Sequence, residues 1–89
     1  MHKVIYLQKA SDDLDRLEQQ TAQRILQKIR YCSLQNNPLA FAKRLTDPAL
    51  GQYRFRIGEY RAIFDVDKKG RIQILMILRI KHRKDIYGL

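Results

Sequence analysis

The chain has 89 residues, a hydrophobic fraction of 45% and a net charge of +9, from 18 basic and nine acidic side chains. This length allows a single domain over residues 1–89 with a modest core. No apolar run exceeds five residues, which excludes a membrane-spanning helix and a secretory leader. The single cysteine, Cys32, permits no internal disulfide, and the sequence has no zinc-type spacing, Gly-rich phosphate loop or cofactor motif. We therefore expect a cytoplasmic protein with no metal, cofactor or membrane partner.

The first half predicts one strand followed by helix. Lys3–Leu7 is rich in β-branched and aromatic residues, as expected of a short strand. Ser11 is predicted to cap a helix whose first turn contains Asp12, Asp13 and Asp15. Apolar residues then recur at helical spacing until the sequence Asn-Asn-Pro at 36–38 ends the helix. Periodicity leaves open whether residues 12–35 form one helix or two.

The second half predicts three consecutive antiparallel strands after a connector at residues 39–51. Tyr53–Ile57 alternates apolar and cationic side chains, Gly58-Glu59 fits a tight turn, and Tyr60–Val66 returns. After a second turn, the apolar middle of Arg71–Ile80 indicates a central strand. The fold class is therefore α+β, with helices packed on one face of a mostly antiparallel sheet.

Positive charge is concentrated in this second half, where residues 41–89 carry 12 basic and five acidic side chains. Arg54 and Arg56 leave the same face of one strand about 6–7 Å apart, and Arg61 lies just past the turn. Clustered guanidinium groups repel one another and grip phosphate with a planar fork, so they favour an anionic ligand. The alternative is a solvated strand face. A second cationic cluster stands at the end of the third strand: Arg79, Lys81, His82, Arg83 and Lys84.

Two side chains near the C-terminus have chemistry besides charge. His82 is the one group in the basic half suited to exchange a proton near neutral pH, although a local hydrogen bond explains it equally well. Tyr87 is able to stack on a base or assist proton transfer, and it is equally able to pin the C-terminal segment to the core.

Two blocks of sequence resemble the RelE/ParE toxin superfamily. Residues Tyr53–Asp67 are similar to its "YRxRxGxYRxxY" block, and Leu78–Tyr87 is similar to its closing "RxxHRxxxY" block. The resemblance covers nearly the whole chain. It implies a microbial-RNase-like fold made of a strand, a helical hairpin and a three-stranded antiparallel meander. It also implies a toxin neutralised by a cognate antitoxin, which enters the ribosomal A site and cuts mRNA there, without a metal, by attack of the 2′-hydroxyl on the neighbouring phosphate.

The resemblance assigns roles to individual residues. Some members have lysines where Arg54 and Arg56 stand, and because arginine keeps its proton, the general base is then His82 or the base role is weak. Lys81 stands where many relatives have Gly, and Phe64 replaces a common Tyr. The implied catalytic residues are Arg54, Arg56, Arg61, His82, Arg83 and Tyr87, and the implied RNA contacts are Lys43, Arg44, Arg79, Lys81 and Lys84.

Two other functions remain open on the same fold. A ParE-like toxin inhibits DNA gyrase by binding, without chemistry. A non-catalytic module would bind RNA in a salt-sensitive way and leave it intact. The basic residues retained in this chain favour the ribosome-dependent nuclease.

Overall fold

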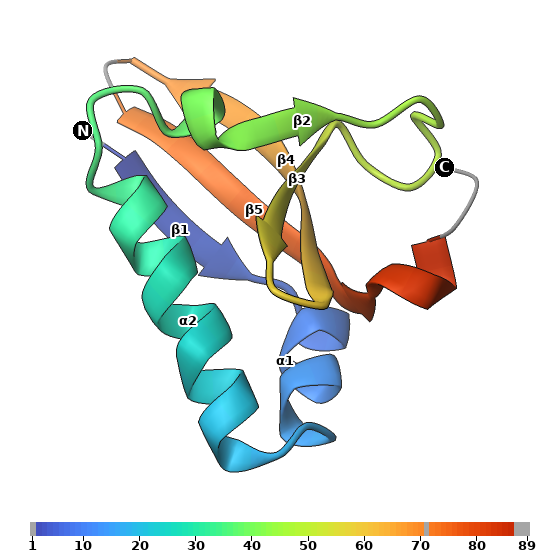
Figure 1. Cartoon of the computed structure of the whole chain (residues 1–89). Helices are drawn as coiled ribbons and strands as arrows, with labels where there is room; N and C mark the ends of the chain where they lie inside the picture. Colours follow the sequence, from blue (N-terminus) through green and yellow to red (C-terminus); the bar gives the residue numbers. More distant parts are fainter. Residues whose placement is uncertain (1, 71, 87–89) are drawn as a thin grey trace.

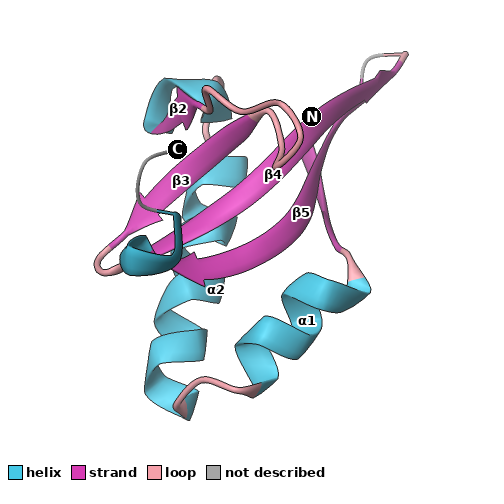
Figure 2. Ribbon diagram, turned by 90° about the vertical axis from the view of Figure 1, so that its right-hand side faces the viewer, coloured by secondary structure: helices cyan, strands magenta, loops and turns pink. Residues whose placement is uncertain are grey.

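The computed structural model describes residues 2–70 and 72–86 (Figure 1). Its centre is one five-stranded sheet in the order β1-β5-β4-β3-β2, in which β1 is parallel to β5 and the other pairs are antiparallel. Two helices pack on one face of this sheet (Figure 2). The elements are β1 (His2–Tyr6), α1 (Gln8–Asp15), α2 (Gln19–Ser33), the 3₁₀ helix η1 (Pro38–Phe41), β2 (Ala42–Arg44), β3 (Tyr53–Ile57), β4 (Tyr60–Lys69), β5 (Ile72–His82) and the 3₁₀ helix η2 (Arg83–Ile86).

The helical region forms two helices, and the prediction for its start was wrong. Ser11 lies inside α1, the first turn of α1 contains no acidic residue, and the N-cap is Leu7, which has no capping side chain. The chain passes directly from β1 into α1, and backbone bonds fix the junction: Leu7 donates to Ile77 and Ser11 donates to Leu7. A strand partner therefore sets this helix start, and a capping side chain is not needed.

The main core lies between the sheet and the helices. Phe55 of β3 and Phe64 of β4 are fully buried and stack with their ring centroids 4.3 Å apart. Ile25 and Ile29 of α2 and Ile77 of β5 join the same cluster. This cluster confirms the predicted apolar faces of the helix and of the strands. Burial of each such side chain stabilises the fold by about 1.5–3 kcal/mol.

A smaller core covers part of the other face. Leu45 from the connector, Ile63 from β4 and Ile86 from η2 pack together there. Gly51 has φ of 150°, and a Cβ at this position would lie 2.6 Å from the Ile63 side chain, so the connector approaches the sheet only because this residue is glycine.

The three-stranded meander of β3, β4 and β5 is confirmed, and the structure adds a strand to it. β2 lies within the predicted connector and pairs with β3, so that Lys43 is opposite Arg54 and Arg44 is opposite Tyr53. Three residues are too few to show alternation in a sequence, which is why this strand was missed. In the parts of the chain that the structure describes, no helix is long and apolar enough to cross a membrane.

Candidate functional site

Cationic side chains surround a small hollow on the sheet face opposite the helices. The hollow has a volume of about 130 Å³, and we call it the arginine hollow; it is lined by Phe41, Lys43, Arg54, Arg56 and Arg61. Strand register explains the gathering, because Lys43 is paired with Arg54 and Arg56 with Arg61. Paired residues project to the same face of a sheet, and the intervening Phe55 points into the main core. Three strands therefore deliver four cations to one place.

Arg61 is the fixed member of this group. Arg61 is only 8% exposed, and its Nη1 donates to the carbonyl oxygens of Gly58 and Tyr60 at 2.8 Å each. Burial lowers the pKa of Arg61, and the charges of Arg56 and Arg54 lower it further. A guanidinium group stays protonated in proteins despite such a shift. The hollow thus contains a buried, oriented cation whose repulsion from its neighbours an anion would relieve.

No ion pair among the described residues involves Arg54, Arg56 or Arg61. The ion pairs join Arg79 to Asp13 and Arg83 to Glu59. Among the described residues, the arginines of the hollow therefore form no ion pair, and the charge of Glu59, which raises the pKa of Arg61, is outweighed by burial and the neighbouring cations.

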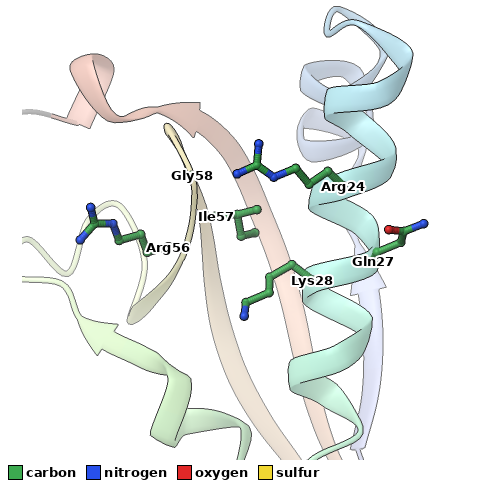
Figure 3. Close-up of a pocket in the computed structure, with 6 residues that line it drawn as sticks. All are labelled: Arg24, Gln27, Lys28, Arg56, Ile57 and Gly58. Carbon is green, nitrogen blue, oxygen red and sulfur yellow. The ribbon is translucent and has the colours of Figure 1, made fainter.

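A second basic hollow lies between α2 and the β3–β4 turn. It has a volume of about 490 Å³ and includes Arg24, Lys28 and Arg56 in its lining. Arg24 and Lys28 reach from α2 toward the turn, whereas Arg56 points to the other side of β3 from Ile57 (Figure 3). Arg56 lines both hollows and so connects them.

Sequence reasoning missed three residues near these hollows. Arg24 and Lys28 were not among the predicted site residues, although their four-residue spacing places two cations on one side of a helix. Phe41 was not among them either, yet it lines the arginine hollow and is 43% exposed. No local pattern marks Phe41, because its place depends on the pairing of β2 with β3.

Arg79, predicted to bind RNA, lies outside the arginine hollow and is held by α1. Its Nε and Nη2 donate to the Asp13 carboxylate at 2.8 and 3.0 Å, and this carboxylate also accepts the backbone N–H of Ile80 at 2.9 Å. Burial raises the pKa of Asp13, but the hydrogen bonds from Arg79 and Ile80 outweigh it and the net pKa is lowered. The charge of Lys81 also lowers this pKa, so Lys81 acts on the same carboxylate. Arg79 therefore serves the contact between β5 and α1, whereas Lys81 makes no ion pair with Asp13 and is paired with Arg61 across the strands.

The end of β5 divides the remaining predicted residues between two faces. His82 is paired with Tyr60 and lies edge-on to its ring with centroids 5.2 Å apart, while Lys81 is paired with Arg61. His82 therefore projects to the face opposite Arg61. Its Nδ1 accepts the backbone N–H of Lys84 at 3.2 Å. The structure does not bring His82 into the arginine hollow.

The other predicted residues lie around the hollow or beyond it. Arg83 is exposed and pairs with Glu59 at 2.7 Å, and its charge still lowers the pKa of Arg61, which places it at the rim. Arg44 lies 5.9 Å from the ring centroid of Tyr53. Lys84 is exposed in η2. Tyr87 lies outside the described residues. Within residues 2–70 and 72–86, no three His, Cys, Asp or Glu side chains gather as a metal site would require.

Comparisons with known proteins agree with this architecture. Residues 4–87 match the family described as ParE toxin of type II toxin-antitoxin system, parDE. The chain is similar to the RelBE2 toxin–antitoxin complex from Mycobacterium tuberculosis, with 25% identity and a TM-score of 0.69 over 91% of this chain and 96% of that one. It is similar to the RelB–RelE antitoxin–toxin complex from Methanococcus jannaschii, with 25% identity and a TM-score of 0.58 over 93% and 94%. The fold also matches the YoeB/ParE toxin from Agrobacterium tumefaciens, at 20% identity and a TM-score of 0.66 over 90% and 97%. A search of curated proteins found no significant match.

Proposed function

Since this chain belongs to the ParE toxin family, and is thus a toxin of a type II toxin–antitoxin system, we propose that it is a ribosome-dependent endoribonuclease that cuts mRNA in the A site. The observation that carries the proposal is the arginine hollow, in which Arg54, Arg56 and the buried Arg61 meet without an ion pair in the described parts of the chain. A solvated strand face has no use for a buried guanidinium group in a fixed orientation. Binding of phosphate does need one, because the guanidinium group donates two parallel hydrogen bonds to it.

The hollow suits the charge that develops during phosphate transfer. In the proposed reaction the 2′-oxygen attacks the adjacent phosphorus, the bond from phosphorus to the 5′-oxygen breaks, and a 2′,3′-cyclic phosphate and a 5′-hydroxyl result. The phosphorane-like transition state carries more negative charge on its oxygens than the substrate does. Guanidinium groups held in place before the reaction stabilise that charge without reorganising, and removal of one such donor typically costs about 10²–10³ in rate.

The reaction also moves two protons. The 2′-hydroxyl loses one, and the departing 5′-oxygen gains one. Arginine is unsuited to this role because it keeps its proton. A lysine loses its proton more readily than an arginine does, and Lys43 is the lysine among the side chains that line the arginine hollow. In place of His82, whose ring lies against Tyr60 across the sheet, we assign Lys43 as the donor of the proton that the departing 5′-oxygen gains. The proton of the 2′-hydroxyl passes to solvent water.

The same surplus of charge suits the proposed partner. An antitoxin segment with acidic side chains would neutralise the arginine hollow and exclude mRNA from it. Similar structures from M. tuberculosis and M. jannaschii are complexes of a toxin with its antitoxin. Acidic complementarity also predicts that the toxin and its antitoxin associate faster at low salt.

A second function has its own support. The matched family description is that of a ParE toxin, and His82 lies on the other face of the sheet from the arginines. Both observations fit a toxin that inhibits DNA gyrase by binding. The arginine hollow favours the nuclease, since inhibition by binding gives no reason to gather Arg54, Arg56 and a buried Arg61 around one hollow.

Two assays on the full chain separate these functions. In a purified translation system, primer extension should reveal cuts within codons of translated mRNA, and the same mRNA without ribosomes should stay intact. In a supercoiling assay, gyrase should keep its activity. Intact mRNA together with inhibited gyrase would replace the nuclease with the alternative.

A further inference from the structure

An exposed aromatic ring borders the arginine hollow. We infer that Phe41 stacks on the base of the nucleotide whose phosphate the hollow holds, so that the site takes an unpaired nucleotide as a unit. This inference rests on the proposed function and adds a base-binding position to it.

The position of Phe41 follows from the strand that it precedes. Phe41 is the last residue of η1 and directly precedes β2, in which Ala42 is paired with Phe55 and Lys43 with Arg54. Arg56 is itself paired with Arg61. Phe41 therefore lies at the start of the strand that delivers Lys43, and its side chain lines the same hollow as Arg56 and Arg61.

The ring of Phe41 is held and yet partly open. Tyr31 of α2 meets it edge-on, with ring centroids 5.9 Å apart and an interplanar angle of 80°. This contact fixes the ring, while 43% of Phe41 stays exposed to solvent. Burial elsewhere in the core is nearly complete for the other two phenylalanines, Phe55 and Phe64. An exposed phenylalanine beside four cations thus calls for a ligand with an apolar part.

An unpaired nucleotide meets both requirements. Its phosphate is bound by guanidinium groups, and its base offers a flat face for stacking on an aromatic ring. A base pair inside a duplex hides that face in the stack, and inorganic phosphate has none. Aromatic platforms beside basic grooves are the usual means by which proteins hold single strands, and each stacked base changes affinity by about 5- to 150-fold.

Binding of non-cleavable strands tests the inference. The probe is a fluorescent 2′-O-methyl RNA heptamer, which cannot be cut by its own 2′-oxygen, and the comparison strand has the same backbone with abasic residues throughout. The wild-type chain should bind the base-bearing strand at least fivefold more tightly. Phe41→Ala should remove this preference and leave the affinity for the abasic strand unchanged. Phe41→Trp should retain the preference, and Phe41→Leu, which keeps an apolar side chain without a ring, should lose it.

A second readout is independent of affinity. 2-Aminopurine placed at successive positions of the heptamer should lose fluorescence at one position on the wild-type protein and at none on Phe41→Leu. Equal affinity of the wild type for both strands, or a Phe41→Ala variant that keeps the preference, would overturn the inference. Arg56→Gln should weaken binding of both strands. If Arg56→Gln binds both strands as tightly as the wild type does, the proposed phosphate site is wrong. If Arg56→Gln weakens binding but the Phe41 variants keep the wild-type affinities, only the base-binding position is wrong.

Discussion

Arg79 and Arg61 stand on neighbouring strands of one sheet, and both are partly or wholly withdrawn from solvent. Arg79 is matched by the Asp13 carboxylate, whose hydrogen bond raises the pKa of Arg79. Among the described residues, Arg61 forms no ion pair and donates to backbone carbonyl oxygens, and burial together with Arg56 and Arg54 lowers its pKa although the charge of Glu59 raises it. The two arginines therefore have opposite environments: that of Arg79 stabilises its charge, and that of Arg61 destabilises it.

The difference indicates what each place is for. A guanidinium group paired within the chain contributes to the folded state, because its charge and hydrogen bonds are satisfied there. A guanidinium group held among other cations costs stability until an anion arrives. The Arg79–Asp13 pair thus stabilises the fold. The arginine hollow is the place where a ligand would supply the negative charge that pairs with the cations.

The largest expected effect is on catalysis when the hollow loses one cation. Arg56→Gln should lower the rate of ribosome-dependent mRNA cleavage by about 10²–10³, because Arg56 is exposed beside the fixed Arg61. Primer extension in a purified translation system measures this rate. The control is Arg16→Gln, which removes the same charge from an exposed position after α1 and should leave cleavage unchanged. Equal losses in the two variants would mean that only overall charge matters.

A smaller loss is expected when the proton carrier is changed and the charge is kept. Lys43→Arg should lower cleavage by about 10²-fold, since general acid–base catalysis contributes about 10²–10⁴, while its affinity for the 2′-O-methyl heptamer stays within twofold. His82→Gln serves as the comparison and should cleave at nearly the wild-type rate. If His82→Gln lowers the cleavage rate about 10²-fold and Lys43→Arg does not, proton transfer belongs to His82.

The scaffold pair predicts an effect on stability in place of activity. Because the pKa of Asp13 is lowered on folding, its contribution is present above the pKa of the unfolded chain, about 3.9, and is lost as the pH falls through the folded value. Asp13→Asn should reduce the free energy of unfolding at pH 7 by about 1–3 kcal/mol and flatten this acid dependence. Urea titrations at pH 7 and pH 3 measure both quantities. Asp15→Asn, on the exposed end of the same helix, is the control, and an equal loss there would contradict the assignment.

The smallest effect has the opposite sign. Arg56→Gln relieves repulsion on the buried Arg61, so its free energy of unfolding at low salt should exceed that of the wild type by about 0.5 kcal/mol. Salt screens this repulsion, and the gain should vanish at high ionic strength. Thermal unfolding at two salt concentrations provides the measurement. A variant less stable than the wild type at low salt would show that Arg56 belongs to the scaffold.

Local patterns in the sequence predicted most of the fold. Alternation in Tyr53–Ile57 and the turn at Gly58 predicted β3 and its partner, because one buried face and one glycine with φ of 59° are local requirements. The start of α1 was not predictable from capping, since backbone bonds to Leu7 and Ile77 define it. β2 was missed because it has no pattern of its own and exists through pairing with β3.

Prediction of the site was limited by contacts distant in sequence. Arg54 and Arg56 were placed together by strand periodicity, and Arg61 joined them through the turn. Arg79 was placed in the second cationic cluster, as an RNA contact, because its ion pair with Asp13 spans 66 residues and has no local signal in the sequence. Alternation between Lys81 and His82 already indicates opposite faces, and that signal was present in the sequence.

The most direct test follows the guanidinium groups themselves. Side-chain Nε–Hε signals of a ¹⁵N-arginine-labelled chain report each arginine separately when the 2′-O-methyl heptamer is added. The account predicts that the signals of Arg54, Arg56 and Arg61 shift in a saturable manner while the signal of Arg79 stays in place. Shifts at Arg79 with none at Arg61 would show that the unpaired cations do not form the ligand site and would contradict the account.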